Sequence, residues 1–329
     1  MSILEKLFGK KRSGSDAPQP EKEIGGRAPS AAVQSACIVT DGVVTGETAE
    51  GTALNVPEGA TAIGKSAFRY HKKLAAVHIP HGVERIGEGA FYGCFSLREL
   101  NLPHSVVRID DGAFNQCRSL VSVTVPDSVT KLGEGVFCDC GSLVSASLPG
   151  SVNRVGYNTF GNCRQLASVE LGAGITAIGQ RAFQFCSELK TVALPDTVTQ
   201  IGETAFYECR GLEAIRIPDR VARIENGAFY GCSALRSVTI PAGVARIEND
   251  TFNSCTELVS VDIPDSVQEI EGWAFYGCEK LTALKIPDAV TKIGESAFAN
   301  CPRLTVLCSE GSYARRYCEE NGILVAQRA

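Results

Sequence analysis

Cysteine is the residue type in this 329-residue chain whose number and spacing most invite a chemical role. Ten of the fourteen cysteines recur every 23 residues from Cys94 to Cys301, and the slot before Cys94 holds His71. Coils stacked at strand spacing, about 4.8 Å, would bring such cysteines within disulfide range. The substitution at His71 shows that no bond is required there, and a single file of thiols does not converge as zinc ligands must. We therefore expect this file, the cysteine ladder, to be buried, reduced and to act as small apolar side chains.

The remaining candidates for chemistry are few. Cys37, Cys308 and Cys318 lie near the ends of the repeat and are expected to be the more exposed thiols. His81 and His104 could form a metal-binding or pH-sensitive patch, but other copies carry aspartate at this position, so we favour a turn role. The chain has no nucleophile motif and no phosphate-binding glycine loop. We predict no catalytic residue, no metal and no cofactor, and hence no enzyme.

The cysteine ladder is one column of a strict 23-residue repeat. Proline, phenylalanine and leucine keep the same period through eleven copies without an insertion, and one copy from Leu97 reads LRELNLPHSVVRIDDGAFNQC. Its alternating apolar residues predict a short strand that ends at Pro103. Val106 and Ile109 would turn the chain back across the core, and the AFNQC stretch predicts a short helical turn. Glycines such as Gly87 are expected to form tight corners with positive φ.

This pattern predicts a repeat solenoid, in which stacked coils bury one another's apolar faces. We expect a leucine-rich repeat with short parallel β-strands on one face and turns and short helical segments on the other. The predicted parts are a flexible tail with a short amphipathic segment (1–33), an N-terminal cap (34–56), the solenoid of eleven coils (57–304) and a C-terminal cap (305–329).

The repeats resemble those of the BspA-like leucine-rich repeat family. The family pattern is seen in LRSVTIPAGVARIENDTFNSC from Leu235 and in LTALKIPDAVTKIGESAFANC from Leu281, and the resemblance covers about residues 37–325. It implies a curved solenoid with parallel strands on one face. It also implies recognition of proteins or host surfaces rather than catalysis.

The amino-terminal residues lie outside the repeat. They lack the uninterrupted apolar stretch of a secretion signal, so we expect a cytoplasmic location, with the cell surface reached by a route not visible in the sequence as the alternative. Apolar residues at helical spacing followed by a basic cluster could give a weak contact with an anionic membrane surface or a partner, and a frayed tail is the alternative. The residues concerned are Ile3, Leu4, Leu7, Phe8, Lys10, Lys11 and Arg12.

The outward strand positions define the expected binding face. One outward row is nearly uniform in small residues, whereas the other varies from coil to coil, as a protein-recognition surface requires. Its predicted partner-binding residues are Asn101, Thr124, Ser147, Glu170, Arg216, Thr239, Asp262 and Lys285.

Charge narrows the class of partner. A net charge of −5 argues against a nucleic-acid partner, which needs a basic surface. The basic file that begins at Arg85 and Arg108 has acidic neighbours three residues later, which favours a self-compensating face over a basic stripe. We predict a non-catalytic protein-interaction scaffold of undefined oligomeric state. The alternatives are a bacterial surface adhesin or host-binding protein, and a self-assembling structural module.

Overall fold

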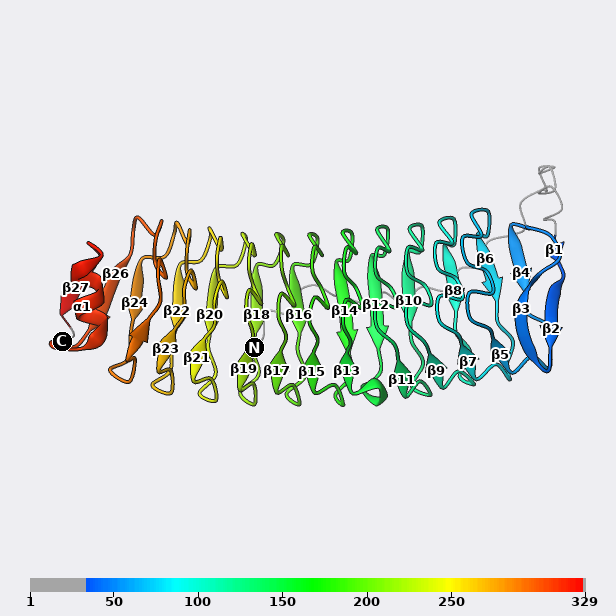
Figure 1. Cartoon of the computed structure of the whole chain (residues 1–329), viewed down its shortest axis with the longest axis horizontal. Coiled ribbons are helices and arrows are strands. Elements are labelled where there is room, and N and C mark those ends of the chain that lie inside the picture. The colour runs from blue at the N-terminus through cyan, green and yellow to red at the C-terminus, as the bar shows by residue number, and fades with distance from the viewer. Residues whose placement is uncertain (1–33, 328–329) are drawn as a thin grey trace, which may run out of the picture. The chain divides into compact units, whose positions relative to one another are not determined.

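A computed structural model describes residues 34–327, which form one stack of similar coils (Figure 1). Each coil contributes a strand to one parallel array, which we term the long-strand file. It consists of β4 (Ala53–Asn55), β6 (Ala76–His78), β8 (Glu99–Asn101), β10 (Ser122–Thr124), β12 (Ser145–Leu148), β14 (Ser168–Leu171), β16 (Thr191–Ala193), β18 (Ala214–Arg216), β20 (Ser237–Thr239), β22 (Ser260–Asp262), β24 (Ala283–Lys285) and β26 (Thr305–Cys308). The predicted parallel strands on one face are therefore confirmed.

A second array of parallel strands, the short-strand file, runs beside the first and was not predicted from the sequence. Its two-residue strands lie where Val106, Ile109 and their equivalents were expected only to return the chain. They are β5 (Ala62–Ile63), β7 (Arg85–Ile86), β9 (Arg108–Ile109), β11 (Lys131–Leu132), β13 (Arg154–Val155), β15 (Ala177–Ile178), β17 (Gln200–Ile201), β19 (Arg223–Ile224), β21 (Arg246–Ile247), β23 (Glu269–Ile270) and β25 (Lys292–Ile293).

Other elements close the two ends of the stack. At the amino end, β1 (Gln34–Ser35) pairs with β4, while β2 (Cys37–Thr40) pairs antiparallel with β3 (Val43–Glu47), which itself pairs with β5. At the carboxyl end, α1 (Tyr313–Glu320) precedes β27 (Leu324–Gln327), which pairs with β26. The side chain of Ser312 caps α1 by accepting a hydrogen bond from the Arg315 amide. A 3-10 turn, η2 (Gly150–Val152), interrupts one coil.

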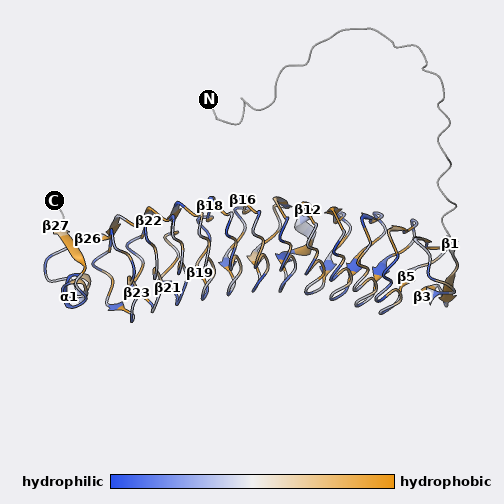
Figure 2. Cartoon of the chain, turned by 90° about the horizontal axis from the view of Figure 1, so that it is seen from above, coloured by the Kyte–Doolittle hydropathy of each residue, from blue (hydrophilic) through white to orange (hydrophobic). Residues whose placement is uncertain are grey.

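Stacked phenylalanine rings form the centre of the coils. The rings of neighbouring coils, from Phe68 to Phe298, lie 5.3–5.8 Å apart between centroids and nearly parallel. Such pairs contribute about 0.5–1.5 kcal/mol beyond their buried area. At the carboxyl end the Tyr317 ring of α1 packs edge-on against Phe298. Each coil thus carries hydrophobic and hydrophilic stretches side by side (Figure 2), because only the inward positions meet this core.

The third side of each coil is a run of linked turns, the turn run, and in every coil it takes the place of the expected short helical segment. Backbone N–H groups alternate in direction along it. The amide of Ala90 bonds within its coil to Gly87, whereas the amides of Gly89 and Phe91 bond to carbonyls of the next coil. In a helix, these amides would instead bond to carbonyls of their own segment. The turn run therefore continues the hydrogen bonding between coils.

This alternation demands positive φ at two positions of every coil. In the second coil these positions hold Gly89 and Gly93, with φ of 56° and 71°, but in others they hold residues such as Thr204 and Trp273. The prediction of positive φ at Gly87 is wrong, since that residue has none. A Cβ atom at Gly87 would instead lie 2.7 Å from the backbone nitrogen of Lys65, so glycine there permits close approach between coils.

Burial of the cysteine ladder is confirmed, except that Cys301 is only half-buried. Each ladder thiol also donates a hydrogen bond of 3.0–3.4 Å to a phenylalanine carbonyl of the preceding coil, as Cys94 does to Phe68. All fourteen cysteines are free thiols. The expectation of exposed thiols in the caps is wrong for Cys308 and Cys318, which are buried where α1 and β26 cover the last coil.

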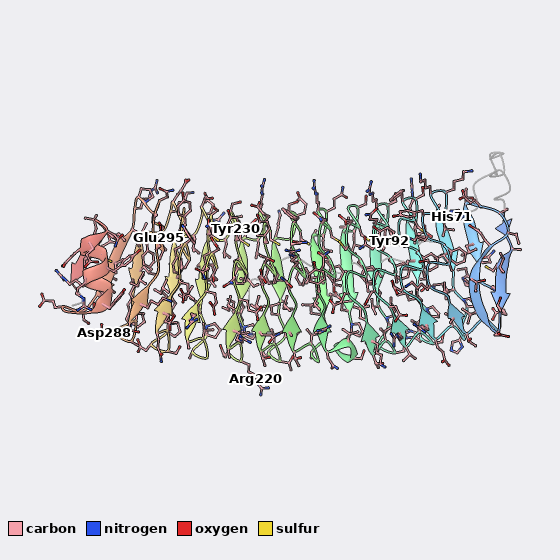
Figure 3. The ribbon with its side chains drawn as sticks, viewed as in Figure 1. His71, Tyr92, Arg220, Tyr230, Asp288 and Glu295 are labelled. Atoms are coloured by element: carbon pink, nitrogen blue, oxygen red, sulfur yellow. The ribbon has the colours of Figure 1, made fainter. Side chains whose placement is uncertain are left out.

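His71 occupies the cysteine slot of the first coil as a buried structural residue. Its Nδ1 accepts a hydrogen bond from the Leu74 amide at 3.1 Å, and its Nε2 lies 2.6 Å from Oε1 of Glu47. The coil before it has Thr45 where later coils have phenylalanine. The contact between His71 and Glu47 takes the place of the bond from a ladder thiol to a phenylalanine carbonyl. Figure 3 shows His71 and Tyr92 on the side of the turn run, away from Arg220 and Asp288 at the opposite edge.

Substitution of Thr204 by glycine tests the cost of the left-handed positions. A β-branched residue at φ 51° is strained, so Thr204→Gly should raise the free energy of unfolding by about 0.5–1 kcal/mol. The matched control is Thr191→Gly in β16, where φ is not positive and glycine should destabilise by a similar amount. Denaturant unfolding measures both. Equal destabilisation by the two changes would show that the left-handed strain is negligible.

Native thiol titration tests the cysteine ladder. Burial raises the pKa of Cys94 to about 12, so its reactive thiolate is nearly absent at pH 8, and the other buried ladder thiols behave alike. Only the half-buried Cys37 and Cys301 should react fast with a chromogenic thiol reagent, and Cys301→Ser should remove one fast thiol. Ten fast thiols, or none in denaturant without reductant, would contradict a buried and reduced ladder.

Candidate protein-binding face

The varied outward row lies along the long-strand file, as its positions predict. Residues between the row positions, such as Val123, point into the core, because successive side chains of a strand point to opposite faces. Strand register places Thr124 beside Ser147 and Ser147 beside Glu170. Ser147 is half-buried, and the exposed members are Asn101, Thr124, Glu170, Arg216, Thr239, Asp262 and Lys285. Their role in binding stays a prediction.

One member of the row has a partner that the sequence did not reveal. Nη1 of Arg216 lies 2.5 Å from Oδ1 of Asp196, which belongs to the turn after β16. The carboxylate raises the pKa of Arg216 by hydrogen bonding and by its charge. Twenty residues separate the two positions, so only stacking of their coils brings them together. Arg216 therefore presents a partly compensated charge to a partner.

A groove of about 680 Å³ hollows the long-strand file at its amino end, across β4, β6, β8 and β10. Side chains on its floor are short at β4 and β6, because the outward row of small residues holds Ala53 and Ala76 there. The groove residues are Ala53, Leu54, Asn55, Ala76, Val77, His78, Arg98, Glu99, Leu100, Asn101, Val121 and Ser122. Of the predicted partner-binding residues, the groove contains Asn101.

The long-strand file is interrupted between β14 and β16, between β18 and β20 and, beside the groove, between β8 and β10. Strands β8 and β10 share no ladder, and the Val121 amide lies 3.4 Å from the Arg98 carbonyl, whereas the next equivalent bond, from Val144 to Val121, measures 2.8 Å. Leu100, the inward residue of β8, is only half-buried although its equivalents in β6 and β10 are buried. The Val121 side chain is 49% exposed. The groove thus offers apolar surface within a polar face.

The groove contains residues that sequence reasoning missed, above all Arg98 and Val121. Both occupy the position just before a long strand, which was not counted among the outward rows. The signal was present, because this position changes from coil to coil among alanine, arginine, valine, lysine, glutamate and threonine. Variation at an exposed repeat position indicates that core packing does not restrict the side chain there.

Charges on the short-strand file compensate one another, but mostly through acidic residues other than those three positions after the cations. The buried carboxylate of Asp110 lies between Arg85, at 2.7 Å, and Arg108. Glu134 pairs with Arg154 in the same way, and Glu269 and Glu271 pair with Arg246 and Lys292 at the other end. These paired cations therefore do not make the short-strand file a basic stripe.

Residues 34–327 contain neither a candidate metal-binding cluster nor a candidate membrane-spanning helix. Within this part of the chain, histidine, cysteine and acidic side chains nowhere gather in threes in a way that could hold a metal ion. None of the helices formed by these residues is both long and apolar enough to cross a membrane. The expected contact through residues Ile3 to Arg12 lies outside the described residues.

Known structures share this architecture. A leucine-rich repeat protein from Bacteroides ovatus is 28% identical, with a TM-score of 0.60 and coverage of 84% of each chain. A leucine-rich cell surface protein from Faecalibacterium prausnitzii is 31% identical, with a TM-score of 0.54 and coverage of 81% of each chain. Comparison with curated protein sequences finds no match.

The repeats also match a family model in sequence. The BspA type leucine rich repeat region matches residues 61–190 and 176–305, which together make up most of the chain. The match spans the coils whose period, strand file and phenylalanine core are described above. The chain belongs to the BspA-type leucine-rich repeat family.

Proposed function

We propose that the chain is a non-catalytic scaffold that binds a protein partner through the long-strand file. The groove carries this proposal, because it combines exposed apolar surface at Leu100 and Val121 with polar groups at Arg98, Glu99 and Asn101. Protein interfaces have this composition, with an apolar centre and a polar rim. Its volume of about 680 Å³ is large enough to seat side chains of a partner.

The rest of the varied row would supply specificity. Glu170, Arg216, Asp262 and Lys285 change the sign of the surface charge along the file. Alternating charges select partners with the complementary pattern and repel others. The row would therefore extend the contact beyond the groove over Thr124, Ser147 and Thr239 as well.

A reducing compartment, the cytoplasm, is the location we propose, because fourteen free thiols suit such conditions. The alternative, a binding protein displayed on the cell surface, is supported by the similarity to the Faecalibacterium prausnitzii protein, which is named as a cell surface protein. Contact of the segment from Ile3 to Arg12 with a membrane or partner stays a proposal.

Cell fractionation decides between the two locations. A cytoplasmic protein should survive protease added to intact cells and should be released only on lysis. A surface-displayed protein should be cleaved on intact cells, with a cytoplasmic marker enzyme left whole as the control. Cleavage under those conditions would overturn the cytoplasmic proposal and leave the binding proposal standing.

Substitution of Val121 by glutamate tests the groove. A charge in this apolar position should reduce recovery of cross-linked partner proteins from native lysate by about tenfold, because it would be desolvated on binding. The matched control is Val259→Glu, which lies at the same repeat position, is similarly exposed at 44% and is outside the groove. Circular dichroism verifies that both variants are folded.

The outcomes separate the groove from the rest of the face. Loss of partners with Val121→Glu alone supports the groove. Loss with a triple alanine variant at Glu170, Arg216 and Asp262 supports the extended row. Unchanged recovery with all three variants would mean that the long-strand file is the wrong face.

A further inference from the structure

Five cations in the first five coils gather at one edge of the stack. Lys72, Lys73, Arg98, Arg118 and Arg164 are exposed at the edge between the turn run and the long-strand file, and we term them the basic ridge. None of the five forms an ion pair within 4.0 Å with another residue of the described part of the chain. By contrast, Lys65 and the arginines of β7, β9 and β13 each have an acidic partner.

The basic ridge is confined to the amino-terminal half. The same three repeat positions in later coils mix both signs, with Glu188, Glu213, Glu257 and Glu279 among the cations. Two ion pairs form there, from Arg210 to Glu208 at 2.6 Å and from Lys280 to Glu257 at 2.7 Å. Since the whole chain carries a net charge of −5, five unpaired cations at one edge are a local concentration of positive charge.

The ridge is continuous with the groove. Arg98 belongs to both, and Arg118 lies in the next coil with its guanidinium 4.7 Å from the centre of the Phe95 ring. Stacking on an aromatic ring orients a guanidinium while leaving its donors free for a carboxylate. Glu99, beside Arg98, is the one acidic residue that lines the groove. A ligand that enters the groove therefore meets apolar surface and the unpaired Arg98 together, and it meets the other cations where it continues along the ridge.

Spacing along the ridge defines the shape of the ligand. Lys72, Arg118 and Arg164 share one repeat position and are two coils apart, which is about 9.6 Å at strand spacing. In the extended polyproline II conformation three residues make one turn and span about 9.3 Å. Carboxylates at every third residue of such a peptide lie on one side of it and would thus meet successive cations, while apolar residues between them face Leu100 and Val121.

We infer that the basic ridge and the groove together bind an extended acidic segment of a protein partner, with Asp or Glu at about every third residue. This inference rests on the proposed binding function of the long-strand file and names the chemistry of the partner. An anionic membrane is a poorer fit, since a flat surface cannot reach the half-buried Leu100 in the groove. Nucleic acid lacks the apolar side chains that Leu100 and Val121 would contact.

Fluorescence anisotropy with synthetic peptides tests the inference on the full chain. The probe is a labelled 15-residue peptide with Asp at every third position and Leu or Val between, and its control replaces each Asp by Asn. Binding should be at least tenfold tighter for the Asp peptide at low salt, and should weaken strongly at high salt because exposed charges are screened.

Matched charge reversals locate the site. Arg98→Glu, Arg118→Glu and Arg164→Glu combined should weaken binding of the Asp peptide by at least tenfold. The control combines Arg210→Glu, Arg236→Glu and Arg303→Glu, which makes the same charge change at exposed ridge-edge positions of later coils and should weaken binding less than about twofold. Equal weakening by both triple variants would overturn the inference, as would the absence of any binding at low salt.

Other outcomes distinguish this inference from the proposed function. Tighter binding of vesicles rich in phosphatidylglycerol, or of duplex DNA, than of the Asp peptide would overturn the peptide assignment. Native partners that are lost with Val121→Glu but retained by the Arg98, Arg118 and Arg164 variant would leave the scaffold function intact and refute the acidic ligand. Retention by both variants would refute the acidic ligand and the role of the groove.

Discussion

Hydrogen bonding between coils, at an offset of 23 residues, is the constraint on which the rest of this structure depends. Both strand files and the turn run direct backbone amides to carbonyls of a neighbouring coil, as Ile86 is in register with Ile109 and Phe91 bonds to Ala113. An inserted residue would break three arrays at once and leave polar groups unsatisfied. The same offset stacks each phenylalanine ring on the next and places each ladder thiol against a phenylalanine carbonyl.

This constraint has a local cost. A turn run whose amides bond to the next coil requires two residues with left-handed backbone conformation in every coil. Many of these residues are not glycine. Close approach of the coils also favours glycine at positions such as Gly87, where a Cβ atom would collide with the neighbouring backbone. Packing and hydrogen bonds across the stack outweigh this strain, because each coil is covered by neighbours on both sides.

Residues outside the core can vary in sequence, and the proposed function depends on this variation. Outward positions of the long-strand file do not contact the next layer of the core, so Glu170, Arg216 and Asp262 can vary without disturbing the stack. The two halves of the molecule thereby differ in charge although their backbones repeat. At the amino end the unpaired Arg98 borders the groove and other unpaired cations continue along the same edge, whereas in later coils glutamates stand among the cations and pair with Arg210 and Lys280. A uniform scaffold thus presents a non-uniform surface.

The period, the fold class, the buried ladder and the outward row could be predicted from the spacing of residue types along the chain. What neighbouring coils do to one another followed only from the folded structure. The pairing of Arg216 with Asp196, the burial of Cys308 and Cys318, and the conformation of Gly87 depend on atoms from other coils or from the cap. The groove at Leu100 and Val121 likewise lies across β4, β6, β8 and β10, strands whose sequences obey the same repeat as the rest. A periodic sequence specifies which side chains face inward, but distances between non-neighbouring side chains are set only when the coils stack.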